Sequence, residues 1–214
     1  MAELHFYPGQ KILAVLEGGK VTKRFVAYGG PEHGGSDPRM PEIPTTSGTF
    51  IIHHTHAYST PSWPMSKIKW GTPLKDMWPG KDDVWYQLSS GKWGSVKNDI
   101  GISRSDLVAY YQALYNTTTS PDKWLFNDFG PVAIRYFKDL NGNKKLDGKE
   151  SLSGEMIHTT PLNEAEFVNG DPITMKHSHG CIHIKPQDRN VLQGMGLFKN
   201  GIVFKVHSYK DRLK

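Results

Sequence analysis

The pattern of apolar and polar positions along the chain predicts mostly strands. The apolar run KILAVL at 11–16 and the strand-like segment at 21–28 flank the turn sequence EGGK, which indicates a hairpin within residues 4–29. A loop rich in Gly, Pro and Ser follows. Further strands are predicted at 49–54, 131–137, 154–158 and 201–207.

Two short helices complete the predicted elements. The first spans 105–116, where apolar residues repeat at helical spacing and Ser105 or Asp106 can cap the start. The second begins near Pro186 and ends at Gly194 or two residues later. The fold class that follows is mainly β with short helices.

The segment at about 55–130 differs from the rest of the chain, since it holds all six tryptophans between short Gly and Pro breaks. We interpret it as an insertion or subdomain, built around the helix at 105–116, within a single domain spanning 1–214. We expect most of its tryptophans to fill a small core. The alternative is that they stack on sugar rings or line a peptide cleft. They are Trp63, Trp70, Trp78, Trp85, Trp93 and Trp124.

Composition narrows the function classes. The chain of 214 residues carries a formal net charge of +5, but its basic residues are scattered without a dense run, which favours a solvated mixed surface over a nucleic-acid interface. No apolar stretch reaches the roughly 18 residues of a membrane span. No signal peptide is visible at the N-terminus. The protein therefore stays inside the cell, leaves by another route, or has lost a leader.

An oxygen-rich segment, DLNGNKKLDGKE at 139–150, follows the spacing of an EF-hand-type calcium loop, although Lys144 stands where such loops carry Gly. The alternative is a polar hairpin rich in turn-forming residues. A structural Ca²⁺ bound here would steady the following strand. The predicted ligands are Asp139, Asn141, Asn143, the backbone carbonyl of Lys145, Asp147 and Glu150.

The segment KHSHGCIHIK contains the only cysteine of the chain. Because His177, His179, Cys181 and His183 alternate, they would share one face of a strand and suggest a metal site. They would spread over about 20 Å, which is too far for one ion. Gly180 also permits an unusual backbone angle that turns successive N–H groups toward an oxyanion. We therefore favour a loop that presents a nucleophile.

A cysteine nucleophile needs a base from elsewhere in the chain. His158 is the best candidate, because it ends a predicted strand and is followed by two threonines that can orient it. A second cluster, His53, His54 and His56, is a weaker candidate for zinc; exposed or substrate-facing histidines are the alternative.

The sequence Ser-His-Gly-Cys at 178–181, with His158 upstream, resembles the active-site motif of the L,D-transpeptidases of the YkuD family. The segment PTTSGTF at 44–50 looks like the Thr-Pro-x-Gly-x-Phe segment that precedes a core strand in that family. The resemblance covers about 3–54 and 131–207, and it implies a β-sandwich or barrel-like catalytic domain with a Trp-rich insertion.

The resemblance also implies a mechanism. Cys181 would attack the carbonyl of the L,D peptide bond of a peptidoglycan tetrapeptide stem, with no cofactor, and form a thioester. His183 stands where the family usually has Asn or Arg. The implied catalytic residues are Cys181, His158 and His179, with Gly180, Ser178 and Thr159 supporting the loop and oxyanion, and His183 and Arg189 contacting the substrate.

Several outcomes stay open at this point. The thioester could pass to an amine of a second stem in a 3-3 cross-link, to a D-amino acid, or to water, which is carboxypeptidase activity. The protein would act in the periplasm or cell wall, either as a housekeeping enzyme or as an exported antibacterial effector with secretion-system or immunity partners. The alternative is a non-catalytic module on the same fold that binds peptidoglycan or zinc.

Overall fold

The structure of the chain is a computed structural model that describes residues 2–35 and 41–214. These residues divide into two compact units. The barrel unit comprises Met1–His56, Ala133–Thr159 and Thr174–Lys214, and the tryptophan unit comprises Ala57–Val132 and Thr160–Ile173. The predicted insertion overlaps the first segment of the tryptophan unit, whereas nothing in the sequence pattern indicated the second.

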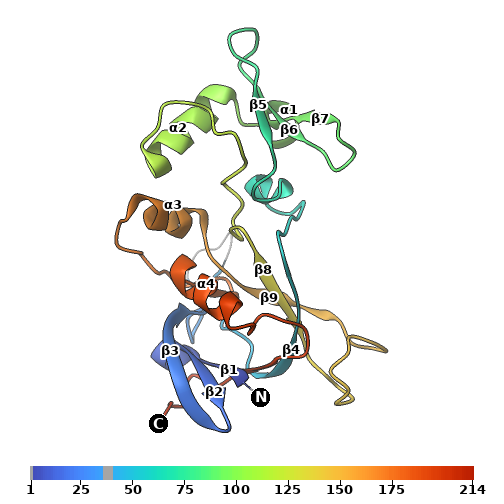
Figure 1. Cartoon of the computed structure of the whole chain (residues 1–214), viewed down its shortest axis with the longest axis vertical. Coiled ribbons are helices and arrows are strands. Elements are labelled where there is room, and N and C mark those ends of the chain that lie inside the picture. The colour runs from blue at the N-terminus through green and yellow to red at the C-terminus, as the bar shows by residue number, and fades with distance from the viewer. Residues whose placement is uncertain (1, 36–40) are drawn as a thin grey trace. The chain divides into compact units, whose positions relative to one another are not determined.

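The strands of the barrel unit are β1 (Ala2–Tyr7), β2 (Ile12–Glu17), β3 (Lys20–Tyr28), β4 (Gly48–His56), β8 (Ala133–Phe137), β9 (Leu152–His158), β10 (Ile182–Ile184) and β11 (Val203–Val206). They close into a barrel in the order β1-β11-β4-β8-β9-β10-β3-β2 (Figure 1). The pairs β1–β11 and β9–β10 are parallel, and the other pairs are antiparallel. The 3-10 helix η1 (Pro8–Gln10) and the helix α4 (Pro186–Gly194) complete the unit. The prediction of a mainly β, barrel-like fold with short helices is confirmed.

Aromatic side chains fill part of the barrel core. On β11, Phe204 is fully buried while its neighbour Lys205 is exposed, as strand alternation requires. The ring of Phe50, the last residue of PTTSGTF, meets the ring of Tyr136 edge-on with centroids 5.0 Å apart. Tyr136 in turn meets Phe204 at 5.0 Å. The motif at 44–50 thus ends in a residue that ties β4 to β8 and β11 through the core.

The tryptophan unit contains a small sheet and several helices. Its elements are η2 (Pro64–Lys67), β5 (Leu74–Asp76), β6 (Val84–Gln87), β7 (Trp93–Ser95), α1 (Val96–Ile100), α2 (Arg104–Tyr115) and α3 (Pro161–Asn169). The strands form a sheet in the order β5-β6-β7. Within the described residues, neither unit has a helix with the length and apolar character that crossing a membrane requires.

The predicted cap of α2 was wrong by two or three residues. The cap is Ser103, whose Oγ accepts a hydrogen bond from the backbone N–H of Asp106 at 3.1 Å. The carboxylate of Asp106 accepts one from the backbone N–H of Ser103 at 3.3 Å. This reciprocal pair is a capping box, so Asp106 closes the first turn from inside the helix.

The expectation that most tryptophans fill the core was also wrong. The buried core cluster of the tryptophan unit consists of Ile68, Val84, Val96, Leu107, Trp124 and Phe126. Trp124 is fully buried, whereas Trp78 is 61% exposed and Trp93 is 40% exposed. Strand alternation explains part of this result. Val84 packs in the core from one face of β6, so its neighbour Trp85 points to the other face.

Candidate active site

The barrel brings Cys181 and His158 to neighbouring strands. His158 is the last residue of β9, and Cys181 directly precedes β10. In the parallel pairing, His183 lies opposite His158, and Ile182 lies opposite Ile157. Because alternate residues share a face, Cys181 and His183 lie on the same face. The predicted nucleophile and base therefore belong to one stretch of sheet.

The loop before β10 has a conformation that requires glycine. Gly180 has φ +99°, which disfavours any residue with a Cβ. A Cβ there would also lie 3.2 Å from the Ile43 side chain and 3.3 Å from the Glu155 carboxylate. Ser178 is buried, and its hydroxyl donates a hydrogen bond to the carbonyl of Cys181. The Ser178 hydroxyl thus fixes the backbone at the nucleophile position.

The imidazole of His158 is buried and neutral. Its side chain is buried, and its Nδ1 lies 2.8 Å from the carbonyl oxygen of Thr159. A carbonyl can only accept, so Nδ1 carries the proton and Nε2 is the unprotonated ring nitrogen. Burial, and then the nearby His183, lower the pKa of His158 to about 3. The two imidazole rings meet at 75° with centroids 4.8 Å apart.

The thiol of Cys181 is neutral as well. Burial raises its pKa to about 11, and the carboxylate of Glu155 adds to that rise. A hydrogen bond from the Met156 backbone and the positive charge of Arg135 act in the opposite direction. At neutral pH the site therefore holds a thiol and an uncharged imidazole. In such a pair, a nucleophile would arise by transfer of the thiol proton to a base during attack, without a preformed ion pair.

Glu155 is a site residue that the sequence did not reveal. Its carboxylate accepts hydrogen bonds from the backbone N–H of Thr46 at 3.0 Å and from the Thr46 hydroxyl at 2.8 Å. It also accepts one from the hydroxyl of Tyr136 at 3.3 Å. A lone glutamate in a strand carries no pattern that could signal this role. The contacts explain why the segment at 44–50 belongs to the site, since Thr46 is tied to β9 beside the nucleophile loop.

Three other predicted site residues lie on the loop before β10, on β10 and on α4. His179 is exposed on the nucleophile loop. The Nδ1 of His183 lies 3.2 Å from the carbonyl of Lys176, and burial lowers the pKa of His183 to about 4. Arg189 is a buried residue of α4 that donates to Oδ1 of Asn190 at 2.9 Å. The substrate contacts expected of His183 and Arg189 stay predictions.

The histidines of β4 crowd together. The ring centroids of His53 and His54 are 4.7 Å apart, and those of His54 and His56 are 4.4 Å apart. Burial, followed by the charges of these neighbours, lowers the pKa of His54. Over residues 2–35 and 41–214, however, no group of three or more His, Cys, Asp or Glu residues is placed to hold a metal ion. Zinc binding at this cluster is therefore a prediction without geometric support.

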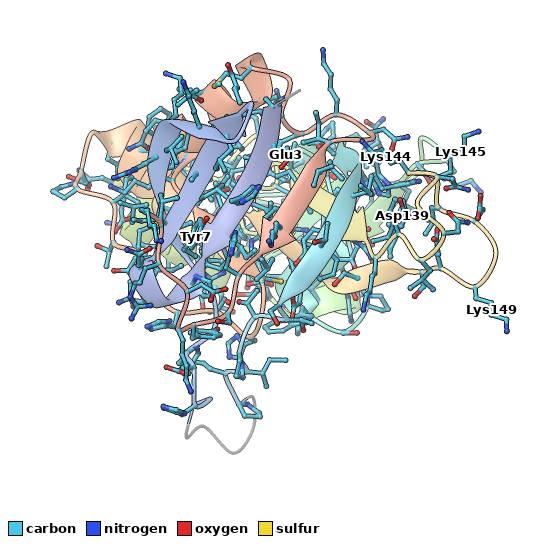
Figure 2. All side chains as sticks on the ribbon, turned by 90° about the horizontal axis from the view of Figure 1, so that it is seen from below. Glu3, Tyr7, Asp139, Lys144, Lys145 and Lys149 are labelled. Carbon is cyan, nitrogen blue, oxygen red and sulfur yellow. The ribbon has the colours of Figure 1, made fainter. Side chains whose placement is uncertain are left out.

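The loop at 139–150 folds around its own carboxylates. Asp139 accepts hydrogen bonds from the backbone N–H groups of Gly142 at 2.8 Å and Lys144 at 2.9 Å. Glu150 accepts one from the backbone N–H of Leu140 at 2.7 Å. Lys144 has φ +58°, at the position where calcium loops carry Gly. Figure 2 shows the side chain of Lys149 projecting away from the strands. Calcium binding stays a prediction.

The model of the YkuD L,D-transpeptidase catalytic domain matches residues 6–194. The chain belongs to the YkuD L,D-transpeptidase family. This match spans both Cys181 and His158. It also spans the Trp-rich segment at about 55–130, which the motif resemblance does not cover.

Two solved structures resemble this YkuD-family chain. An L,D-transpeptidase (residues 123–326) from Xylanimonas cellulosilytica DSM 15894 shares 10% identity with a TM-score of 0.40, over 96% of this chain and 60% of that one. An L,D-transpeptidase from Mycobacterium smegmatis shares 16% identity with a TM-score of 0.37, over 97% and 59% respectively. The chain thus spans about 60% of the length of these structures. No curated protein matches it.

Proposed function

We propose that the chain is a cysteine-dependent L,D-transpeptidase that acts on the tetrapeptide stems of peptidoglycan. The observation that carries this proposal is the pairing of β9 with β10, which sets a neutral His158 on the strand next to the one that follows Cys181. Family membership supports the same reaction class. The substrate lies in the periplasm or cell wall, so the protein acts there.

In the first step, Sγ of Cys181 attacks the carbonyl carbon of the L,D peptide bond while its proton passes to Nε2 of His158. The carbonyl oxygen becomes an oxyanion, and backbone N–H groups around Gly180 stabilise it. When the C–N bond breaks, the imidazolium of His158 returns the proton to the departing amine of D-Ala. A thioester on Cys181 remains.

In the second step, a nucleophile attacks the thioester and gives up a proton to Nε2 of His158. The C–S bond breaks, and the imidazolium returns this proton to the sulfur, so that Cys181 leaves as a thiol. An amine of a second stem gives a 3-3 cross-link, a free D-amino acid gives exchange, and water trims the stem. The carboxylate of Glu155 lies beside the nucleophile loop, within contact range of where a Cβ on Gly180 would stand. A negative charge there favours the approach of an acceptor that carries an ammonium group.

The test is acylation of the thiol. Intact-protein mass spectrometry with a carbapenem should show one adduct on the native protein and none on Cys181→Ala, because the chain has a single cysteine. Purified tetrapeptide muropeptides should be converted by the native protein alone. If there were neither adduct nor turnover, the proposal would fail in favour of a non-catalytic module on this fold.

A structural Ca²⁺ in the loop at 139–150 is a separate part of the proposal. In the family reaction no metal is needed, so the ion would act only on stability, by steadying the connection from β8 to β9. Calorimetric titration with calcium should release or absorb heat and raise the melting temperature. An Asp139→Asn, Asp147→Asn variant should do neither. If the native protein gives no heat and no shift, the ion is ruled out.

A further inference from the structure

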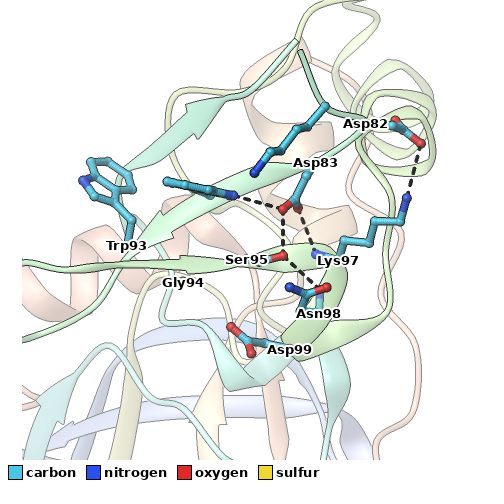
Figure 3. Close-up of a pocket in the computed structure, with 10 residues that line it drawn as sticks. Asp82, Asp83, Trp93, Gly94, Ser95, Lys97, Asn98 and Asp99 are labelled. Carbon is cyan, nitrogen blue, oxygen red and sulfur yellow. Dashed lines mark hydrogen bonds and ion pairs between the residues drawn. The ribbon is translucent and has the colours of Figure 1, made fainter. Parts of the chain in front are cut away.

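The tryptophan unit contains an open cavity of about 660 Å³ whose lining includes none of the residues of the proposed chemistry. Figure 3 shows it between β6, β7 and α1, with Trp93 at one end and Asp82 and Lys97 at the other. All of its lining residues belong to this one unit. They are Lys81, Asp82, Asp83, Trp85, Trp93, Gly94, Ser95, Lys97, Asn98 and Asp99.

The cavity occupies the face of the sheet that the core does not use. In the register of β6 and β7, Trp85 lies opposite Ser95, and Gln87 lies opposite Trp93. On β6, Val84 and Tyr86 alternate with Trp85 and Gln87 and pack in or against the core. The side chains of Trp85 and Gln87, with Ser95 and Trp93 opposite them, therefore share the other face of the sheet. Trp85 and Trp93 are therefore diagonal neighbours on the solvent side. Burial in the core does not explain why two large aromatic side chains stand there.

A buried carboxylate holds the floor of the cavity rigid. Asp83 is only 8% exposed, and it accepts a hydrogen bond from Nε1 of Trp85 at 3.0 Å. It also accepts from Oγ of Ser95 at 2.7 Å and from the backbone N–H of Lys97 at 3.1 Å. These three bonds satisfy Asp83 and orient the indole of Trp85. The cavity is thus preorganised before any ligand arrives.

The charges at the rim argue against a polyanion as the ligand. The lining has two lysines and three aspartates, although the whole chain carries a net charge of +5. One lysine, Lys97, stands 4.0 Å from Asp82, and the other, Lys81, lies over the ring of Trp85 at 5.4 Å. Lys97 is therefore partly neutralised by a carboxylate, and Lys81 is already engaged with an aromatic face. What remains is one open indole face, that of Trp93, beside polar groups that both donate and accept.

We propose that this cavity binds a sugar ring of a glycan strand. A pyranose has one face of C–H groups that packs on an indole, and equatorial hydroxyls that bond to carboxylate, amide and ammonium groups. The acetamido group of an N-acetylated sugar suits the side-chain amide of Asn98, which can both donate and accept. The choice of an N-acetylated glycan rests on the proposed peptidoglycan substrate. The sugar-binding site itself rests on the lining residues.

The test uses the full chain as Cys181→Ala, so that no substrate is turned over. The probes are N-acetylchitotetraose, which has sugar and no peptide, and a free tetrapeptide stem, which has peptide and no sugar. In isothermal titration calorimetry, the chitotetraose should bind, and Trp93→Ala should weaken it by about tenfold or more. Trp93→Phe should retain most of the affinity, because it keeps an aromatic face.

Trp78→Ala is the matched control. Trp78 is the most exposed tryptophan of the unit, but it does not line the cavity, and its ring already stacks on Arg104 at 5.3 Å. This variant should bind chitotetraose as tightly as its parent. Equal loss in both variants would mean a nonspecific effect and would overturn the proposal.

Two further outcomes separate this inference from the transpeptidase proposal. If a carbapenem acylates Cys181 in the native protein and chitotetraose does not bind, the sugar site is wrong and the enzyme stands. If chitotetraose binds through Trp93 and Cys181 is never acylated, the sugar site stands and the enzyme is wrong. If the free tetrapeptide binds with an affinity that depends on Trp93 and the sugar does not, the cavity is a peptide site and the inference fails.

Discussion

The two units divide the reactive residue types of the chain between them. All ten histidines and the single cysteine lie in the barrel unit, and all six tryptophans lie in the tryptophan unit. In the barrel unit, the proposed chemistry uses a buried imidazole and a half-buried thiol that are both neutral at physiological pH. In the tryptophan unit, the proposed binding uses an exposed ring and charged groups. One unit is suited to proton transfer between neutral groups, and the other to recognising a hydrated surface.

This division gives each unit its own probe. Tryptophan fluorescence reports only on the tryptophan unit, and alkylation of Cys181 reports only on the barrel unit.

Loss of the proposed base, His158, should have the largest effect. His158→Gln removes the lone pair that receives the thiol proton, so acylation of Cys181 by a carbapenem should slow by about 10²- to 10⁴-fold. The measurement is the rate of adduct formation by mass spectrometry. The tryptophan fluorescence spectrum should not change. His33→Gln, a change at a histidine far from the motif in sequence, should acylate at the native rate, and a rate loss of less than threefold in His158→Gln would assign the base elsewhere.

Acid should unfold the barrel unit selectively. In the unfolded chain, His158 and His183 take up protons near pH 6.5, whereas in the folded barrel their pKa values are about 3 and about 4. The unfolded state thus binds more protons below pH 6.5. Stability is complete above that pH, and it falls as the pH drops toward 4, by up to about 1.4 kcal/mol per pH unit for each histidine.

Urea titrations at about pH 7.5 and about pH 5 would measure this effect. The midpoint for Cys181 alkylation should fall at the lower pH, and the midpoint for tryptophan fluorescence should fall less, because the tryptophan unit has no histidine. His183→Gln should reduce the pH dependence of the first midpoint. Equal shifts of both midpoints would show that the units unfold together.

Removal of the α2 cap should act on the other unit alone. Ser103→Ala leaves the backbone N–H of Asp106 without its side-chain acceptor, which should lower the free energy of unfolding by about 1 kcal/mol. The urea midpoint of tryptophan fluorescence should fall, and the alkylation midpoint should not. The control is Ser90→Ala, in an exposed turn of the same unit. A change in the alkylation midpoint alone would contradict the assignment of α2 to the tryptophan unit.

Glu155→Gln should have the smallest effect, on the thiol itself. The carboxylate raises the pKa of Cys181, so its neutralisation should lower that pKa and speed alkylation by iodoacetamide at about pH 8.5 by about threefold. A pH–rate profile separates this electrostatic effect from a loosened loop, which would change the limiting rate instead. Glu17→Gln, on the exposed end of β2, should behave as the native protein.

Local patterns in the sequence predicted most strands of the barrel, because apolar residues run or alternate along them, but they did not predict β10, which has three residues. The run at 49–54 and the strand ending at His158 both lie where they were predicted. The short strands β5 and β7 have three residues each, too few for any periodicity to be recognised. Elements of this length are stabilised by tertiary contacts.

For the candidate site, the sequence offered a signal only where a motif stands in one continuous stretch. The pattern SHGC predicted a nucleophile loop, and the preceding strand made His158 the candidate base; the structure places both at the paired strands β9 and β10. Glu155 was missed because its role depends on Thr46, more than a hundred residues away, folding onto β9. The exposure of Trp93 was missed because composition cannot tell which face of a strand a residue occupies until register is known.

The segment from 160 to 173 belongs to the tryptophan unit, although it lies in the connection between β9 and β10, the two strands of the candidate active site. Its helix α3 contacts α2, and the side chain of Asn169 donates a hydrogen bond to the carbonyl of Leu114 at 2.9 Å. Anyone who wishes to move the tryptophan unit onto another barrel must therefore transplant two separate pieces of chain. Excision of 57–132 alone would remove α2, the helix against which α3 packs. It would leave α3 unsupported within the connection from β9 to β10.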